Sequence, residues 1–126
     1  MMNVSDLLST LLRVAPELVP AYEEHLTDHG EALPHVFMGE VSQYVIRSFE
    51  SAFERPGEPR DEVLQAILTA IENALRAGSD ETRNVISASF VENIALAAKA
   101  HPGVRSRLGN SLKRELGLVL RAWGEE

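Results

Sequence analysis

Three histidines are spaced in the sequence so that their side chains could bind a metal ion. His25 and His29 lie four residues apart, and His35 follows them closely. Two imidazoles at that spacing share one face of a helix and can bind zinc, with a third ligand completing the site. The residue after His25 is Leu26, where the helical metalloprotease motif has a glutamate. We therefore predict no metal and no cofactor.

A second candidate is Glu92, in the segment SASFVENIALAA that spans residues 87–98. On a regular helical wheel Glu92 shares an arc with Val85 and Leu96, so the pattern predicts a buried carboxylate. Such a group needs hydrogen-bond donors or a cation, or it takes up a proton.

Two interpretations of Glu92 follow. In the structural one it accepts hydrogen bonds from another helix or a loop, in a polar framework that it forms with Asn93 and Asn84. In the catalytic one it is a general acid or base, which needs a cleft and a partner. The nearest partners along the chain, Lys99 and His101, are at least seven residues away. The structural interpretation is therefore favoured.

The remaining sequence offers no catalytic motif. The chain has no cysteine, which excludes disulfides, thiolate metal sites and a cysteine nucleophile. It contains neither a glycine-rich phosphate loop nor a serine nucleophile elbow. We expect no catalytic residues and no enzymatic activity.

Charge is distributed unevenly along the 126 residues. The net charge is −7, which makes nucleic acid a poor partner. Residues 1–40 carry seven acidic residues and one basic residue. This acidity either aids solubility or forms a docking surface for a basic protein. The candidate docking residues are Glu17, Glu23, Glu24, Asp28 and Glu31.

Apolar spacing predicts an all-α protein of about six helices in one domain, residues 1–126. No alternating strand pattern or hairpin signal is present. The expected helices begin at the Asn3 cap, at Pro20, at Pro34, near Asp61, after Ser79 and near Val104. The segment RPGEPR, residues 55–60, is expected to be a loop. The fifth helix, which ends near Ala100, is apolar on two faces and should therefore lie between other helices at the centre of the domain. A stack of antiparallel helix pairs is an alternative arrangement of the same helices.

The sequence has no apolar run long enough to span a bilayer, and its first residues lack the pattern of a signal peptide. We expect a cytoplasmic protein without a membrane partner.

Two stretches resemble a family of small, uncharacterised, all-helical bacterial proteins. The first, Leu33–Val45, has a Leu-Pro-His start and a Met-Gly-acid helix, and the second, Ala77–Ile94, ends in Phe-x-Glu-Asn. The matching residues are Leu33, Pro34, His35, Met38, Gly39, Glu40, Gly78, Asp80, Glu81, Asn84, Phe90, Glu92 and Asn93. The resemblance implies small acidic proteins encoded with polymorphic toxins, with an immunity role and no catalytic residues.

Three functions remain open at this stage. One is a non-enzymatic binding module, an immunity-like protein that neutralises a basic toxin domain. The second is a helical adaptor or a self-associating structural protein. The apolar final helix, which ends in Trp123, supports this function. The third is an unrecognised enzyme or metalloprotein built on Glu92 or the histidines.

Overall fold

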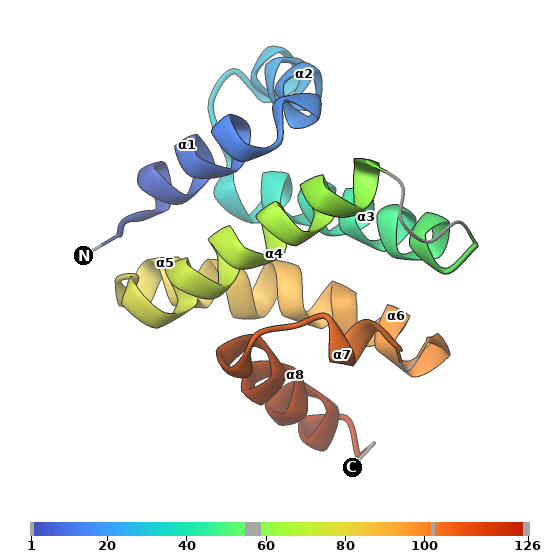
Figure 1. Cartoon of the computed structure of the whole chain (residues 1–126). Helices are drawn as coiled ribbons and strands as arrows, with labels where there is room; N and C mark the ends of the chain where they lie inside the picture. Colours follow the sequence, from blue (N-terminus) through green and yellow to red (C-terminus); the bar gives the residue numbers. More distant parts are fainter. Residues whose placement is uncertain (1, 55–58, 102, 125–126) are drawn as a thin grey trace.

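The computed structural model describes residues 2–54, 59–101 and 103–124, and in these ranges every regular element is helical (Figure 1). This confirms the predicted all-α class. The elements are α1 (Val4–Val14), the 3-10 turn η1 (Pro16–Leu18), α2 (Val19–His29), α3 (Pro34–Glu54), α4 (Pro59–Ala77), α5 (Asp80–Ile86), the π-helical segment η2 (Ser87–Val91), α6 (Glu92–Ala100), α7 (Gly103–Ser106) and α8 (Asn110–Ala122).

Several helix ends lie where the sequence signals place them. Asn3 and Asp6 form a reciprocal capping box at the start of α1. Gly30 ends α2 with a φ of 76°, a left-handed conformation that favours glycine. The side chain of Ser79 caps α5 by accepting a hydrogen bond from the Thr82 N–H. These ends are therefore specified locally.

Two boundaries differ from the expectation. The final helix expected from Val104 is divided into the single turn α7 and the longer α8, and Gly109 is the N-cap residue of α8. Helix α4 begins at Pro59, ahead of the expected Asp61. Most of the predicted loop, residues 55–58, lies outside the described residues.

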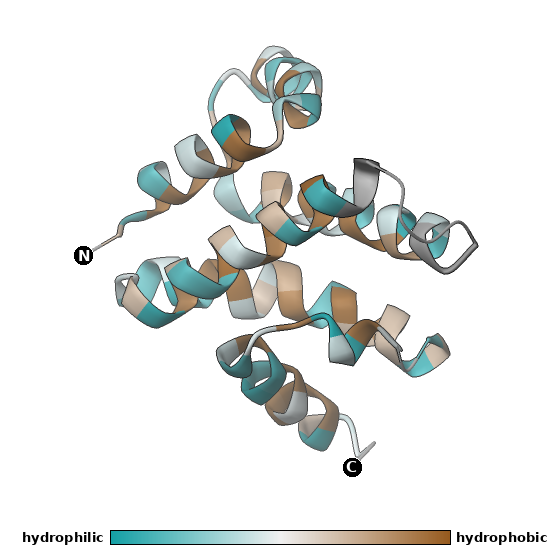
Figure 2. Cartoon of the chain, viewed as in Figure 1, coloured by the Kyte–Doolittle hydropathy of each residue, from teal (hydrophilic) through white to brown (hydrophobic). Residues whose placement is uncertain are grey.

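The continuous helix formed by α5, η2 and α6 lies centrally, as predicted. It packs against α1, α3 and α4 through its first half and against α3, α7 and α8 through its second half (Figure 1). Brown, apolar ribbon faces line the interior between these helices in Figure 2. No described helix is long and apolar enough to cross a membrane.

The π-helical segment η2 changes which residues of the central helix are buried. A π turn holds an extra residue, so everything after it is rotated by about 100° relative to an uninterrupted α-helix. Val85 is buried, yet Glu92 is exposed and Leu96 is 61% exposed. The prediction that Glu92 is a buried carboxylate was therefore wrong. Asn84 is also exposed, which corrects its place in a buried polar framework.

Candidate functional site

Of the three proposed framework residues, only Asn93 makes the expected contacts. Its Nδ2 donates to Ser42 Oγ at 3.0 Å and to the Ser89 carbonyl oxygen at 3.0 Å. Ser42 is fully buried, and its hydroxyl donates to the Gly39 carbonyl at 2.6 Å. Asn93 therefore joins the buried Ser42 of α3 to the π turn.

The carboxylate that caps another helix is Glu72, which the sequence analysis did not single out. Its Oε1 accepts from the Leu112 N–H at 2.9 Å, and its Oε2 accepts from the Ser111 N–H at 3.0 Å. Free N–H groups at a helix start are stabilised by such an anion. The role expected for Glu92 is thus performed by a residue of α4 at the start of α8. Nothing in the sequence around Glu72 marks the distant helix end.

The three histidines are divided between two environments. His25 is only 2% exposed, and its ring lies 4.7 Å from that of His29 between centroids. His35 lies elsewhere, with its Nδ1 2.6 Å from Ser89 Oγ. Among the described residues no group of three potential metal ligands is present.

His35 and Ser89 bring an imidazole and a hydroxyl within hydrogen-bond distance. A nucleophilic serine would need a third group that orients its base. In the part of the chain that the structure describes, no carboxylate forms a hydrogen bond or an ion pair with His35. The pair therefore has the geometry of a surface hydrogen bond between α3 and η2.

The five candidate docking residues are all exposed, and they lie on η1, on α2 and just after α2. Residues 14–46 contain six acidic residues and no lysine or arginine. Residues 94–124, at the opposite end of the molecule in Figure 1, contain six basic residues and one acidic residue. The fold therefore separates the charge into an acidic end around α2 and a basic end around α7 and α8.

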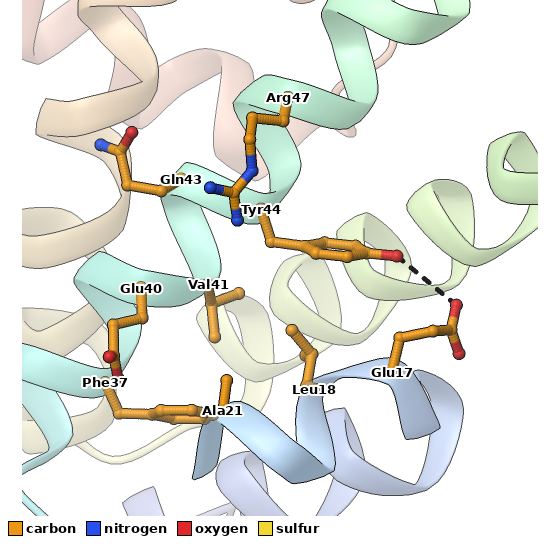
Figure 3. A pocket seen from close by; sticks show the side chains of 9 residues that line it. All are labelled: Glu17, Leu18, Ala21, Phe37, Glu40, Val41, Gln43, Tyr44 and Arg47. Carbon is orange, nitrogen blue, oxygen red and sulfur yellow. Dashed lines mark hydrogen bonds between the residues drawn. The ribbon is translucent and has the colours of Figure 1, made fainter. Parts of the chain in front are cut away.

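A pocket of about 340 Å³ lies at the acidic end, between α3 and the segment formed by η1 and α2 (Figure 3). Its apolar lining consists of Leu18, Ala21, Phe37 and Val41. The polar lining consists of Glu17, Glu40, Gln43, Tyr44 and Arg47. We refer to these nine residues as the α2–α3 pocket. The volume is near the lower end of the range for small-ligand sites, which suits one or two side chains.

Each carboxylate of the pocket has one polar neighbour. The Tyr44 hydroxyl donates to Glu17 Oε2 over 3.4 Å, a long hydrogen bond (Figure 3). Glu40 Oε2 lies 3.4 Å from Nδ1 of the buried His25. His25 Nε2 accepts from the Leu33 N–H at 3.0 Å, so in the neutral ring the proton is on Nδ1 and faces Glu40.

His25 and Glu40 are close together, but they do not form a hydrogen bond. The separation is within ion-pair range, yet His25 Nδ1 is buried without a hydrogen-bond partner among the described residues. A neutral imidazole interacts through a directional N–H group, so a distance of 3.4 Å without the matching angle is not a hydrogen bond. The Glu40 carboxylate is therefore close to His25 but not locked in place by it.

The sequence did not reveal this pocket because its lining comes from two segments about twenty residues apart. Glu17 was recognised only as one of several acidic residues, and Val41 and Tyr44 were not singled out. No short motif links them. The packing of α2 against α3 is what brings them together.

Comparison with known proteins identifies a family but no characterised relative. No curated protein and no solved structure matches the chain significantly. Residues 8–124, which include the whole α2–α3 pocket, the Asn93 contacts and the Glu72 cap, match a family described as a domain of unknown function (DUF7674). The chain therefore belongs to this uncharacterised family.

Proposed function

We propose that this protein is a non-enzymatic binding module whose acidic end docks a basic protein. The observation that carries the proposal is the charge of residues 14–46, where six exposed carboxylates occur without a lysine or arginine. The α2–α3 pocket lies within this acidic end and offers an apolar surface beside the carboxylates.

The charge separation favours one orientation of a basic partner. Attraction at the α2 end and repulsion at the α7 and α8 end both turn a positively charged protein toward α2. Such complementarity raises the association rate more than it raises the final affinity.

An immunity-like role in the cytoplasm is the specific form of this proposal. Its support is the resemblance of Leu33–Val45 and Ala77–Ile94 to small acidic proteins encoded with toxins. Several of these matching residues belong to the framework, because Met38 and Phe90 are fully buried and Asn93 joins α3 to η2. The partner in this proposal is a basic toxin domain that the acidic end occludes.

The direct experiment measures binding to the product of the adjacent gene by surface plasmon resonance. A variant with Glu23, Glu24 and Asp28 changed to Lys should associate more slowly than the wild type. The matched control changes the exposed residues Glu50, Glu62 and Glu92 to Lys, which alters the net charge equally at other places. Equal rates for the two variants would contradict docking at the acidic end.

Self-association is a second candidate function, favoured by exposed apolar side chains. Leu96, Leu118 and Trp123 are 61%, 50% and 40% exposed on the last helices. Opposite charges at the two ends also suit a head-to-tail contact between copies. Light scattering coupled to size exclusion tests this: a mass that rises with concentration and falls with salt supports self-association, and a constant monomer mass contradicts it.

A further inference from the structure

We propose that the α2–α3 pocket receives an arginine side chain of the partner protein, with its guanidinium against Glu40. This inference rests on the proposed function, and it names the group that the acidic end recognises.

The shape and lining suit a long side chain with a cationic end. Ala21 is partly exposed in the pocket, above the buried Leu18 and Val41, and the methylene groups of an arginine can lie over it. Figure 3 shows these side chains between the two carboxylates, Glu17 and Glu40. A neutral apolar side chain would cover the same floor but would leave both carboxylates beside it without a cation.

His25 supplies an independent observation that points to an occupant. It is 2% exposed, and its Nδ1 has no hydrogen-bond partner among the described residues although it faces Glu40 Oε2 at 3.4 Å. A buried donor without a partner is costly. A guanidinium that binds the outer side of Glu40 holds this carboxylate in place, so that Oε2 can also accept from His25 through its second lone pair.

Arginine fits the rim better than lysine. Its planar guanidinium can bind a carboxylate with two parallel hydrogen bonds and can stack on an aromatic ring. Glu40 offers the carboxylate, and its side chain is 48% exposed. The ring of Tyr44 lines the same pocket.

Arg47 also lines the pocket, and it provides an internal test. In the part of the chain that the structure describes, its guanidinium forms no hydrogen bond or ion pair. As a like charge it should oppose an incoming guanidinium. Removing Arg47 should therefore strengthen binding, whereas removing Glu40 should weaken it.

The experiment titrates the ¹⁵N-labelled full chain with Nα-acetyl-arginine-N-methylamide and follows amide chemical shifts by NMR. The neutral citrulline analogue, which has nearly the same shape, is the matched control probe. We expect saturable shifts at the amides of Ala21, Val41 and Tyr44 with the arginine probe, and none with citrulline. Equal responses to the two probes, or no saturable shift at these amides, would overturn the proposal.

Three variants locate the probe. Glu40→Gln should weaken binding about tenfold or more, since a charge-assisted hydrogen bond is lost. Arg47→Met should strengthen it by up to about fivefold, the range for exposed charge pairs. Ala21→Leu should abolish binding by filling the pocket without changing any charge. Weaker binding by Arg47→Met, or unchanged binding by Ala21→Leu, would place the cation elsewhere.

This experiment can fail separately from the proposed function. If the arginine probe does not bind but the α2 charge reversals still slow association with the partner, the acidic end docks a protein and the pocket is not its anchor. The pocket inference would then be wrong while the docking surface stands.

Discussion

Asn93 of α6 donates a hydrogen bond to Ser42 Oγ of α3 over 3.0 Å. The pair joins the central helix to α3 directly after the π turn. Ser42 is fully buried, whereas Glu92, the neighbour of Asn93, is exposed. Adjacent polar residues in one motif thus have opposite structural roles.

The first prediction compares these neighbours. Asn93→Ala should lower the free energy of unfolding by about 1–2 kcal/mol, because Ser42 loses a partner in a buried place. Glu92→Ala should change it by less than about 0.5 kcal/mol, as is usual for exposed positions. Urea denaturation followed by circular dichroism measures both. A larger loss for Glu92→Ala would contradict the register that the π turn sets.

The second prediction concerns Glu72 and Gly109. A Cβ added at Gly109 would lie 2.6 Å from Glu72 Cδ, so the glycine leaves room for the capping carboxylate. Glu72→Ala should cost about 1–2 kcal/mol through loss of the α8 cap. Gly109→Ala should also destabilise the wild type, because the carboxylate must move away from the helix start.

The double variant, Glu72→Ala with Gly109→Ala, tests whether alanine at position 109 destabilises the protein only by displacing the Glu72 carboxylate. The φ of Gly109 is −73°, which alanine adopts freely. Once Glu72 is alanine, Gly109→Ala should be neutral, or stabilising by up to about 1 kcal/mol through the unfolded state. Additive losses in a double-mutant cycle would show that the two residues are not coupled.

The third prediction concerns the π turn in the central helix. Deleting the exposed Ala88 should convert the segment to a regular α-helix while Ile86 and Ile94 remain inward, because the deletion removes the extra residue. Deleting the exposed Thr69 from the regular helix α4 should rotate the residues after it by about 100° and disrupt the core. Thermal melts should show a cooperative transition for the first variant only. Equal damage by both deletions would refute this account.

The fourth prediction concerns salt. Exposed charges are screened over roughly 8–10 Å at physiological ionic strength. Association with the proposed basic partner should therefore slow as salt rises, and the variant in which Glu23, Glu24 and Asp28 are changed to Lys should lose most of that dependence. Helix α2 should stay folded, since the Asp28→Lys substitution places a cation near the helix C-terminus, where positive charge is favourable. Rapid-mixing kinetics at two salt concentrations test this, and a rate independent of salt would contradict steering.

The sequence alone determined the helical class and many helix ends, because those features depend on neighbouring residues. Apolar spacing, the Asn3 cap and Gly30 act within a few positions along the chain. The charge of residues 14–46 could also be counted directly, and all six acidic residues proved exposed.

The tertiary structure decided which polar residues have partners. A wheel at a constant angle per residue placed Glu92 inside, and one extra residue in the π turn was enough to expose it. Glu72 became a cap only because α8 begins beside α4, some forty positions later. The α2–α3 pocket likewise depends on tertiary packing. It forms where the segment of η1 and α2 packs against α3, and the sequence of neither segment specifies the angle between them. Such contacts depend on how whole helices meet, and local spacing does not specify that geometry.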